Sequence, residues 1–218
     1  MSAETARFDL IETMAFDPAI GLPMLDRHMA RLQASATELD FKLNRHALRN
    51  ELQAATFGFV DAKRVRVLLA RSGAMAVEVR DAGPWPQAIM QVAIVPRTLP
   101  GDDPRIRHKT TDRRHYQAAL KAGGTFEVLM TDEQGYLTEG TFSSIFVERG
   151  DKLVTPPLSR GLLPGVLRQS LIDMGEAEEA DLRPHDLDNG FFIGNAARGL
   201  VAASVVPAKV APTVARGA

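Results

Sequence analysis

The chain has no cysteine, and two kinds of hydrophobic segment are missing as well. Without a thiol there is no disulfide framework, no thiolate nucleophile and no cysteine-ligated metal site, which fits a reducing compartment. The first residues lack the apolar core of a signal peptide, and no apolar run approaches the length that spans a bilayer. The sequence therefore predicts a cytoplasmic protein with no membrane segment and no metal site.

Net charge and aromatic residues are also scarce. The formal net charge is −1 and aromatic residues make up 6% of the 218 residues, so no global field favours nucleic acid. Apolar residues at 45% and charged residues at 24% are typical of a globular protein. We expect one domain or two small ones, and small-molecule partners rather than nucleic acid or membrane.

Glycine and proline at Gly83-Pro84-Trp85-Pro86 divide the chain into two parts. We predict an α+β fold with a small lobe at residues 1–83, a linker at 84–89 and a larger lobe at 90–218, with the ligand site at the lobe interface. Asn44 is expected to cap a helix, and Pro164 to lie in the first turn of another.

Residues 202–218 are expected to form a last strand with a frayed end, or a partly disordered tail. Hydrophobic periodicity predicts strands at 8–14, 63–70, 75–80, 90–96, 127–131, 142–148, 152–155, 191–194 and 200–206, and helices at 24–39, 44–56, 116–122 and 164–174.

Three segments carry the groups that one phosphate-bearing aldehyde cofactor needs. Lys109 lies in a basic segment, residues 105–113, whose cations would disfavour the ammonium form and favour a nucleophilic amine. Glu139 follows a turn, where a partly buried carboxylate could keep a pyridine nitrogen protonated. Val166 and Leu167 open a helix after Gly165, so their N–H groups could bind a phosphate. The combination predicts pyridoxal 5'-phosphate (PLP), with Lys109 as the Schiff-base amine and as the general base and acid.

Three further polar residues could complete the site. Arg31 could join the phosphate cradle, Asn195 could bond a phosphate or substrate oxygen, and Arg198 could bind a substrate carboxylate. Each candidate taken alone also fits an ordinary surface role, so the prediction depends on their order and spacing. A non-enzymatic protein that binds anions or nucleic acid through residues 105–114 stays open as a rival, although the segment has few aromatic residues for base stacking.

Several motifs resemble those of one enzyme family along nearly the whole chain. They are Phe8-Asp-Leu-Ile-Glu12-Thr13, His28-x-x-Arg31-Leu32, His108-Lys109-Thr110, Thr138-Glu139-Gly140-Thr141-x-Ser143 and Gly161-Leu162-Leu163-Pro164-Gly165. Together they are similar to the class IV aminotransferases, the fold-type IV PLP enzymes. The resemblance implies a small N-terminal lobe, a larger barrel-like lobe with a mixed sheet, and a homodimer. It makes Arg31 a phosphate ligand and implies substrate contacts for Thr13, His28, Arg113 and Arg198.

Within the family, Lys109-Thr-Thr-Asp-Arg113 and Asn195-x-x-Arg198-Gly199 look most like the aminodeoxychorismate lyases. These cleave 4-amino-4-deoxychorismate to 4-aminobenzoate and pyruvate in folate biosynthesis. Branched-chain and D-amino acid aminotransferases are the alternatives. The chain departs from longer relatives in lacking a leading segment, with Asp-Arg-Gly and Gly-Asp-Gly turns, that helps shape the substrate pocket. It also has Leu167 where many relatives carry a phosphate-binding threonine, so only the backbone N–H could serve there.

Overall fold

The computed structural model describes residues 8–208, which divide into two compact units. The first unit contains the chain up to Pro84 together with residues 107–113 and 196–198. The second contains residues 85–106 and 114–195 and the chain from residue 199 onward. The lobe boundaries expected from the sequence stay a prediction, and residues 209–218 of the expected tail lie outside the described residues.

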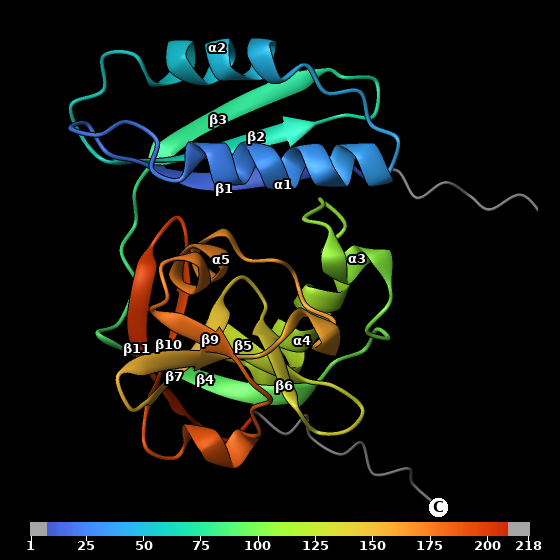
Figure 1. Cartoon of the computed structure of the whole chain (residues 1–218), viewed down its shortest axis with the longest axis vertical. Helices are drawn as coiled ribbons and strands as arrows, with labels where there is room; N and C mark the ends of the chain where they lie inside the picture. The colour runs from blue at the N-terminus through green and yellow to red at the C-terminus, as the bar shows by residue number, and fades with distance from the viewer. Residues whose placement is uncertain (1–7, 209–218) are drawn as a thin grey trace, which may run out of the picture. The chain divides into compact units, whose positions relative to one another are not determined.

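The first unit is a three-stranded antiparallel sheet with two helices (Figure 1). Strands β1 (Leu10–Phe16), β2 (Lys63–Leu69) and β3 (Met75–Asp81) pair in that order. Helices α1 (Leu25–Glu38) and α2 (Arg45–Thr56) complete the unit. The β2–β3 hairpin and both helices lie within a residue of their predicted bounds, because their hydrophobic periodicity is regular.

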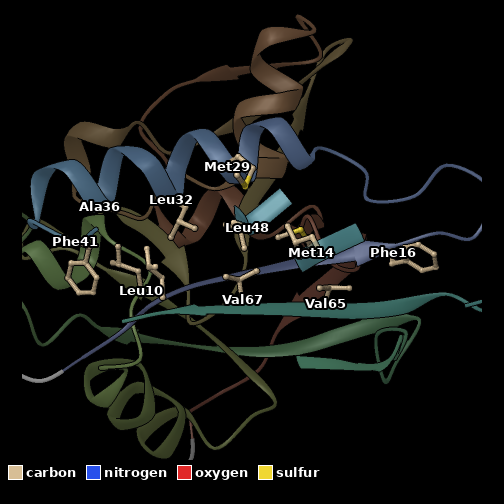
Figure 2. Packing of buried hydrophobic residues seen from close by; sticks show 12 residues of the cluster. Leu10, Met14, Phe16, Met29, Leu32, Ala36, Phe41, Leu48, Val65 and Val67 are labelled. Atoms are coloured by element: carbon tan, nitrogen blue, oxygen red, sulfur yellow. The ribbon is translucent and has the colours of Figure 1, made fainter. Parts of the chain in front are cut away.

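The two helices pack on the same face of this sheet. Met29 and Leu32 from α1 and Leu48 from α2 share a buried cluster with Leu10 and Met14 from β1, as Figure 2 shows. Alternate strand residues point to one face, so β1 can bury one row of side chains against the helices. The opposite row, which begins with Ile11 and Thr13, lies on the face that carries neither helix.

Residues 107–113 run alongside β1 although they come much later in the chain. The N–H of Ile11 donates to the carbonyl of Lys109 at 2.9 Å, and the N–H of Thr111 donates to the carbonyl of Asp9 at 2.9 Å. The hydroxyl of Thr111 also accepts from the N–H of Asp9 at 2.9 Å. These long-range bonds explain why the segment belongs to the first unit.

The second unit is a mixed eight-stranded sheet in the order β6-β5-β4-β11-β10-β7-β8-β9, curled into a half-barrel (Figure 1). Strand β4 pairs in parallel with β5 and β11, and β8 pairs in parallel with β9, while the other pairs are antiparallel. The predicted α+β fold class, with a small sheet-and-helix part and a larger mixed sheet, is confirmed. The strands are β4 (Ile89–Pro96), β5 (Glu127–Thr131), β6 (Leu137–Gly140), β7 (Ser144–Arg149), β8 (Lys152–Thr155), β9 (Ala177–Glu179), β10 (Phe191–Asn195) and β11 (Gly199–Val205), and the helices are α3 (Pro104–Arg107), α4 (Arg114–Gly123), α5 (Val166–Asp173) and the two 3-10 helices Leu158–Arg160 and Pro184–Leu187.

Several local predictions differ from the structure. Helix α5 begins at Val166, so Pro164 precedes the helix instead of lying in its first turn, because Gly165 is still extended at φ −63° and ψ 132°. Strand β7 begins at Ser144, since the residues before it form a tight turn. Strand β6 was not predicted, and it places Glu139 inside a strand.

Asn44 caps α2 as predicted, its side chain accepting from the N–H of Ala47 at 3.0 Å. Strand β1 begins two residues later than expected, at Leu10, and ends at Phe16. Among residues 8–208, no helix is both long enough and apolar enough to cross a membrane.

Candidate active site

Lys109 lies in the first unit, in the segment that is hydrogen-bonded to β1. Its carbonyl accepts from Ile11, and its side chain is half-buried. The preceding residue, His108, is buried, and its Nδ1 lies 3.0 Å from the hydroxyl of Ser35 on α1. The main chain around the candidate amine is therefore fixed by both β1 and α1, which is what a site needs to hold a reactive group in one place.

Arg31 and His28, both on α1, meet the carboxylate of Glu12 on β1. Arg31 donates from Nε to one carboxylate oxygen at 2.8 Å and from Nη2 to the other at 2.6 Å, and His28 Nδ1 lies 2.7 Å from the second oxygen. Burial raises the pKa of Glu12, but the charge of Arg31 and the hydrogen bonds from His28 and Arg31 outweigh it and lower the pKa from 4.5 to about 2. Glu12 is thus ionised, and it fixes the orientation of the guanidinium predicted to bind phosphate.

The residues expected to contact substrate all belong to the first unit. His28 is only 1% exposed and is engaged by its carboxylate partner. Thr13 is half-buried on the face of the sheet that carries neither helix, and Arg113 is half-buried as well. Arg198 donates from Nε to the carbonyl of Gly83 at 3.2 Å. Their contacts with a substrate stay predictions.

Glu139 lies in the second unit and is buried, with 6% exposure. One carboxylate oxygen accepts from the hydroxyl of Tyr116 at 2.7 Å, and the other accepts from the N–H of Leu163 at 3.2 Å. A buried carboxylate held by two donors in this way is suited to accept a further hydrogen bond from a protonated ring nitrogen. Sequence reasoning missed Tyr116, whose only signal was its position in the helix that follows Lys109.

Val166 and Leu167 open α5, where the first N–H groups of a helix have no partner within the helix. Gly165 is the N-cap and supplies no side-chain cap. A β-carbon built on Gly165 would lie 2.6 Å from Oγ of Ser144, so a side chain there would displace the serine. The close approach explains the glycine and leaves the helix start as a cradle for an anion.

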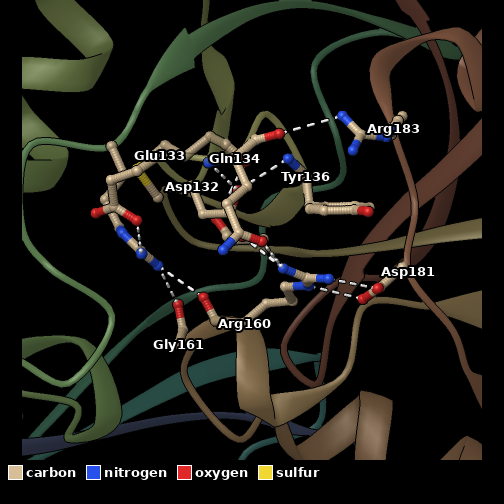
Figure 3. A network of polar contacts seen from close by, with 11 residues as sticks. Asp132, Glu133, Gln134, Tyr136, Arg160, Gly161, Asp181 and Arg183 are labelled. Atoms are coloured by element: carbon tan, nitrogen blue, oxygen red, sulfur yellow. Dashed lines mark hydrogen bonds and ion pairs between the residues drawn. The ribbon is translucent and has the colours of Figure 1, made fainter.

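The segment that leads to α5 is anchored by two arginines, Arg160 and Arg97, that the sequence reasoning did not single out. Arg160 donates from Nε to Asp181 at 2.7 Å, and its guanidinium lies 3.6 Å from the ring centre of Tyr136 (Figure 3). The hydrogen bond from Arg160 lowers the pKa of Asp181. Arg97 donates from Nη1 to the carbonyls of Arg160 at 2.8 Å and Gly161 at 2.7 Å. These contacts hold the glycine-containing loop in a fixed path.

Asn195 ends β10, where its backbone pairs with Gly199 at the start of β11. Its side-chain amide donates to the carbonyl of Phe142 at 3.2 Å. An asparagine amide donates through its NH2 group and accepts through its oxygen, and this bond to Phe142 orients the side chain.

The donor set fits PLP. The second unit supplies a buried carboxylate, Glu139, and a glycine-capped helix start at Val166 and Leu167, and the first supplies Lys109 and an oriented guanidinium on Arg31. These are the groups suited to a ring nitrogen, a phosphate and an aldehyde. In the described part of the chain no group of three or more His, Asp or Glu side chains could hold a metal ion. The joining of the two sets in one site stays a prediction.

Comparisons with known proteins show the family to which the chain belongs. The family model described as amino-transferase class IV matches residues 9–206. A Schizosaccharomyces pombe protein named "Putative aminodeoxychorismate lyase" is 28% identical over 199 residues, which cover 84% of this chain and 82% of that protein. A Methanocaldococcus jannaschii protein named "Putative branched-chain-amino-acid aminotransferase" is 34% identical over 82 residues, which cover 34% of this chain and 28% of that protein.

Solved structures show the same fold. A "Putative amino-acid aminotransferase" from Mesorhizobium loti has a TM-score of 0.84 at 37% identity, covering 91% of this chain and 100% of that one. The PLP-bound form of a "hypothetical aminotransferase" from Mycobacterium tuberculosis has a TM-score of 0.78 at 20% identity, covering 94% of this chain and 84% of that one. The chain belongs to the class IV aminotransferase family and is a PLP-dependent enzyme that acts on a small amino substrate.

Proposed function

We propose that this enzyme is a 4-amino-4-deoxychorismate lyase, which releases 4-aminobenzoate and pyruvate. The observation that carries the proposal is the extent of the likeness to the Schizosaccharomyces pombe protein, which covers 84% of this chain and 82% of that one. The likeness to the Methanocaldococcus jannaschii protein covers 34% of this chain and 28% of that one. The resemblance of residues 109–113 and 195–199 to the lyase subgroup points the same way.

We assign the cofactor contacts as follows. Lys109 binds the aldehyde carbon, and Glu139 holds a proton at the ring nitrogen. The N–H groups of Val166 and Leu167 bind the phosphate, and Arg31 neutralises it from its Glu12-oriented guanidinium. Asn195, whose side chain is oriented by its bond to the Phe142 carbonyl, completes the set and bonds a phosphate oxygen.

The proposed reaction is a β-elimination that needs no co-reactant. The cofactor, when bound, supplies a sink for the electron pair left at the substrate carbon. The amine of Lys109, released by the incoming substrate, takes the proton from the carbon that bears the amino group. The ether bond to the enolpyruvyl group breaks and the ring becomes aromatic. The leaving enolate takes up the proton held by Lys109 and tautomerises to pyruvate.

The substrate carries two carboxylates, and two arginines are proposed to bind them. Arg113 and Arg198 are both half-buried in the first unit, where a guanidinium can form two parallel hydrogen bonds to a carboxylate. Thr13 and His28 are proposed to complete the substrate contacts. Replacing either arginine by lysine is expected to raise KM more than it lowers kcat, because the charge stays while the paired bonds are lost.

Transamination is the second candidate, and one observation favours it. The Mesorhizobium loti protein, with 37% identity over its whole chain, is named as an amino-acid aminotransferase. The same Lys109 and Glu139 would serve, with the proton returned to the cofactor side instead of a bond being broken in the substrate. The donor set therefore does not separate the two outcomes, and an assay must.

The deciding experiment uses the purified holoenzyme with aminodeoxychorismate and no amino donor. Release of 4-aminobenzoate and pyruvate in equal amounts over many turnovers supports the lyase. No such release, together with rapid conversion of the cofactor to its amine form by branched-chain or D-amino acids, contradicts it and supports transamination. Lys109→Ala is the control and should be inactive in both assays. The family resemblance also leads us to propose a homodimer, which sedimentation equilibrium would test.

A further inference from the structure

Glu127, at the start of β5, is a fully buried carboxylate to which the proposed chemistry gives no role. Its exposure is 0%, and the groups that act on its pKa are uncharged. Burial raises the pKa of Glu127, and hydrogen bonds from Thr141, Ser143 and Val128 act in the opposite direction. A carboxyl group without a cationic partner is costly to bury, so its hydrogen bonds must explain its place.

Those hydrogen bonds go mainly to one turn, residues 140–144. One oxygen of Glu127 accepts from the N–H of Thr141 at 2.7 Å, from its hydroxyl at 2.5 Å and from the N–H of Val128 at 2.8 Å. The other accepts from the hydroxyl of Ser143 at 2.8 Å and from the N–H of Phe142 at 3.2 Å. Three successive residues of the turn are therefore bound to a single side chain.

The turn is closed tightly around this carboxylate. The N–H of Gly140 donates to the carbonyl of Ser143 at 2.8 Å. A β-carbon at Gly140 would collide with the Ser143 hydroxyl and lie 3.0 Å from the carboxyl carbon of Glu127. The register of β5 with β6 also shifts between Leu129 and Thr131, and such irregularities change the direction of side chains.

Three of the proposed cofactor contacts are attached to this turn. Glu139 is the residue directly before it. The carbonyl of Phe142 accepts the amide of Asn195 at 3.2 Å. Ser144, where the turn passes into β7, has its hydroxyl 2.6 Å from the position that a β-carbon on Gly165, the N-cap of α5, would take. The ring-nitrogen acid, the asparagine and the phosphate-binding helix start thus share one support.

We propose that Glu127 is a positioning residue that holds the turn at residues 140–144 and, through it, sets the relative placement of Glu139, Asn195 and the start of α5. The proposal rests on the cofactor contacts assigned above. Glu127 does not touch the cofactor. Its role is to keep three contacts from one unit in register, so that all of them bind the same molecule at once.

The test uses the isosteric variant Glu127→Gln. Both carboxylate oxygens of Glu127 accept hydrogen bonds from backbone N–H groups. In either orientation of the glutamine amide, its NH2 group would therefore face a donor instead of an acceptor. Val154→Ala is the matched control, because it removes buried volume from the same unit without changing a hydrogen bond of the turn. Thr141→Val, which removes only the hydroxyl donor, is the milder variant should the first not fold.

Two readouts do not depend on activity. The first is the dissociation constant of PLP, titrated into the apo forms of the full-length proteins. The second is the fluorescence of Trp85, the one tryptophan, whose ring stacks on Phe142 with centres 5.9 Å apart. Thermal unfolding of each apo form shows how much general stability each substitution removes.

We expect Glu127→Gln to weaken PLP binding on the order of tenfold and to change the Trp85 emission, since unmatched buried donors carry a penalty of that size. The Val154→Ala protein should bind PLP within about threefold of wild type despite its lower melting temperature. Glu127→Gln and Thr141→Val proteins that both bind like this control would overturn the proposal. The cofactor assignment itself is tested separately with Glu139→Gln. If this variant keeps the PLP affinity, absorbance spectrum and turnover of wild type, the assignment is wrong.

Discussion

The buried carboxylate of Glu12 gives a quantitative prediction. Its pKa is lowered from 4.5 to about 2 by Arg31 and His28 against the effect of burial. At 1.36 kcal/mol per pKa unit, this difference contributes about 3 kcal/mol to the free energy of unfolding at neutral pH. Glu12→Gln removes the charge and also leaves Arg31 without its bidentate partner, so the loss should be at least of this order.

The pH dependence has a definite sign. Because the pKa in the folded state is lower than in the unfolded chain, the stabilisation is fully present above pH 4.5 and is lost as the pH falls toward 2. By linkage, about 2 kcal/mol of it is gone by pH 3. The difference in unfolding free energy between the wild-type and Glu12→Gln proteins should therefore shrink by this amount between pH 6 and pH 3.

Urea unfolding of the apo proteins, followed by circular dichroism at several pH values, measures that difference. The control is Asp26→Asn on α1, the helix that carries the two partners of Glu12, His28 and Arg31. Asp26 pairs with Arg49 at 2.5 Å but is 83% exposed, so its loss should change stability little at any pH. A difference in unfolding free energy between the wild-type and Glu12→Gln proteins that stays constant with pH would contradict this prediction. A Glu12→Gln protein as stable as the Asp26→Asn control would contradict it as well.

Three further predictions concern the second unit. Tyr116→Phe removes a donor at 2.7 Å from Glu139 and should lower kcat about tenfold with little change in melting temperature, and an unchanged kcat would count against the role given to that carboxylate. Gly165→Ala places a β-carbon 2.6 Å from the Ser144 hydroxyl and should weaken PLP binding about tenfold, with recovery in the Ser144→Ala/Gly165→Ala double variant; without recovery, steric displacement is not the cause. Gly161→Ala combines a φ of 70° with a collision against a backbone carbonyl and should cost about 2 kcal/mol in urea unfolding, whereas wild-type stability would contradict the strained geometry.

Elements with regular periodicity could be predicted from the sequence. The hairpin of β2 and β3 was recognisable because two alternating segments flank Arg71-Ser72-Gly73, and α2 because its apolar spacing follows Asn44, which does cap it. The four-residue strand β6 was missed. Four residues are too few to show a hydrophobic period. The strand forms by pairing with β5, and its own residues do not predict that pairing.

The contacts that organise the candidate site could not be predicted for the same reason. Tyr116 meets Glu139 across 23 residues, and the pair of Arg31 with Glu12 spans 19. The motifs indicated that Arg31 and Glu139 are functional. They gave no sign that a second carboxylate orients the arginine or that a tyrosine binds the acid, because such partners are brought together only by tertiary packing.

We propose that Lys109 is the residue covalently bound to PLP, and every other assignment depends on it. Reducing the holoenzyme with borohydride and mapping the modified peptide by mass spectrometry tests it directly. We predict loss of the cofactor absorbance of the native enzyme and a phosphopyridoxyl group on Lys109 alone. A label on any other lysine, or a cofactor that dissociates unmodified after reduction, would contradict it.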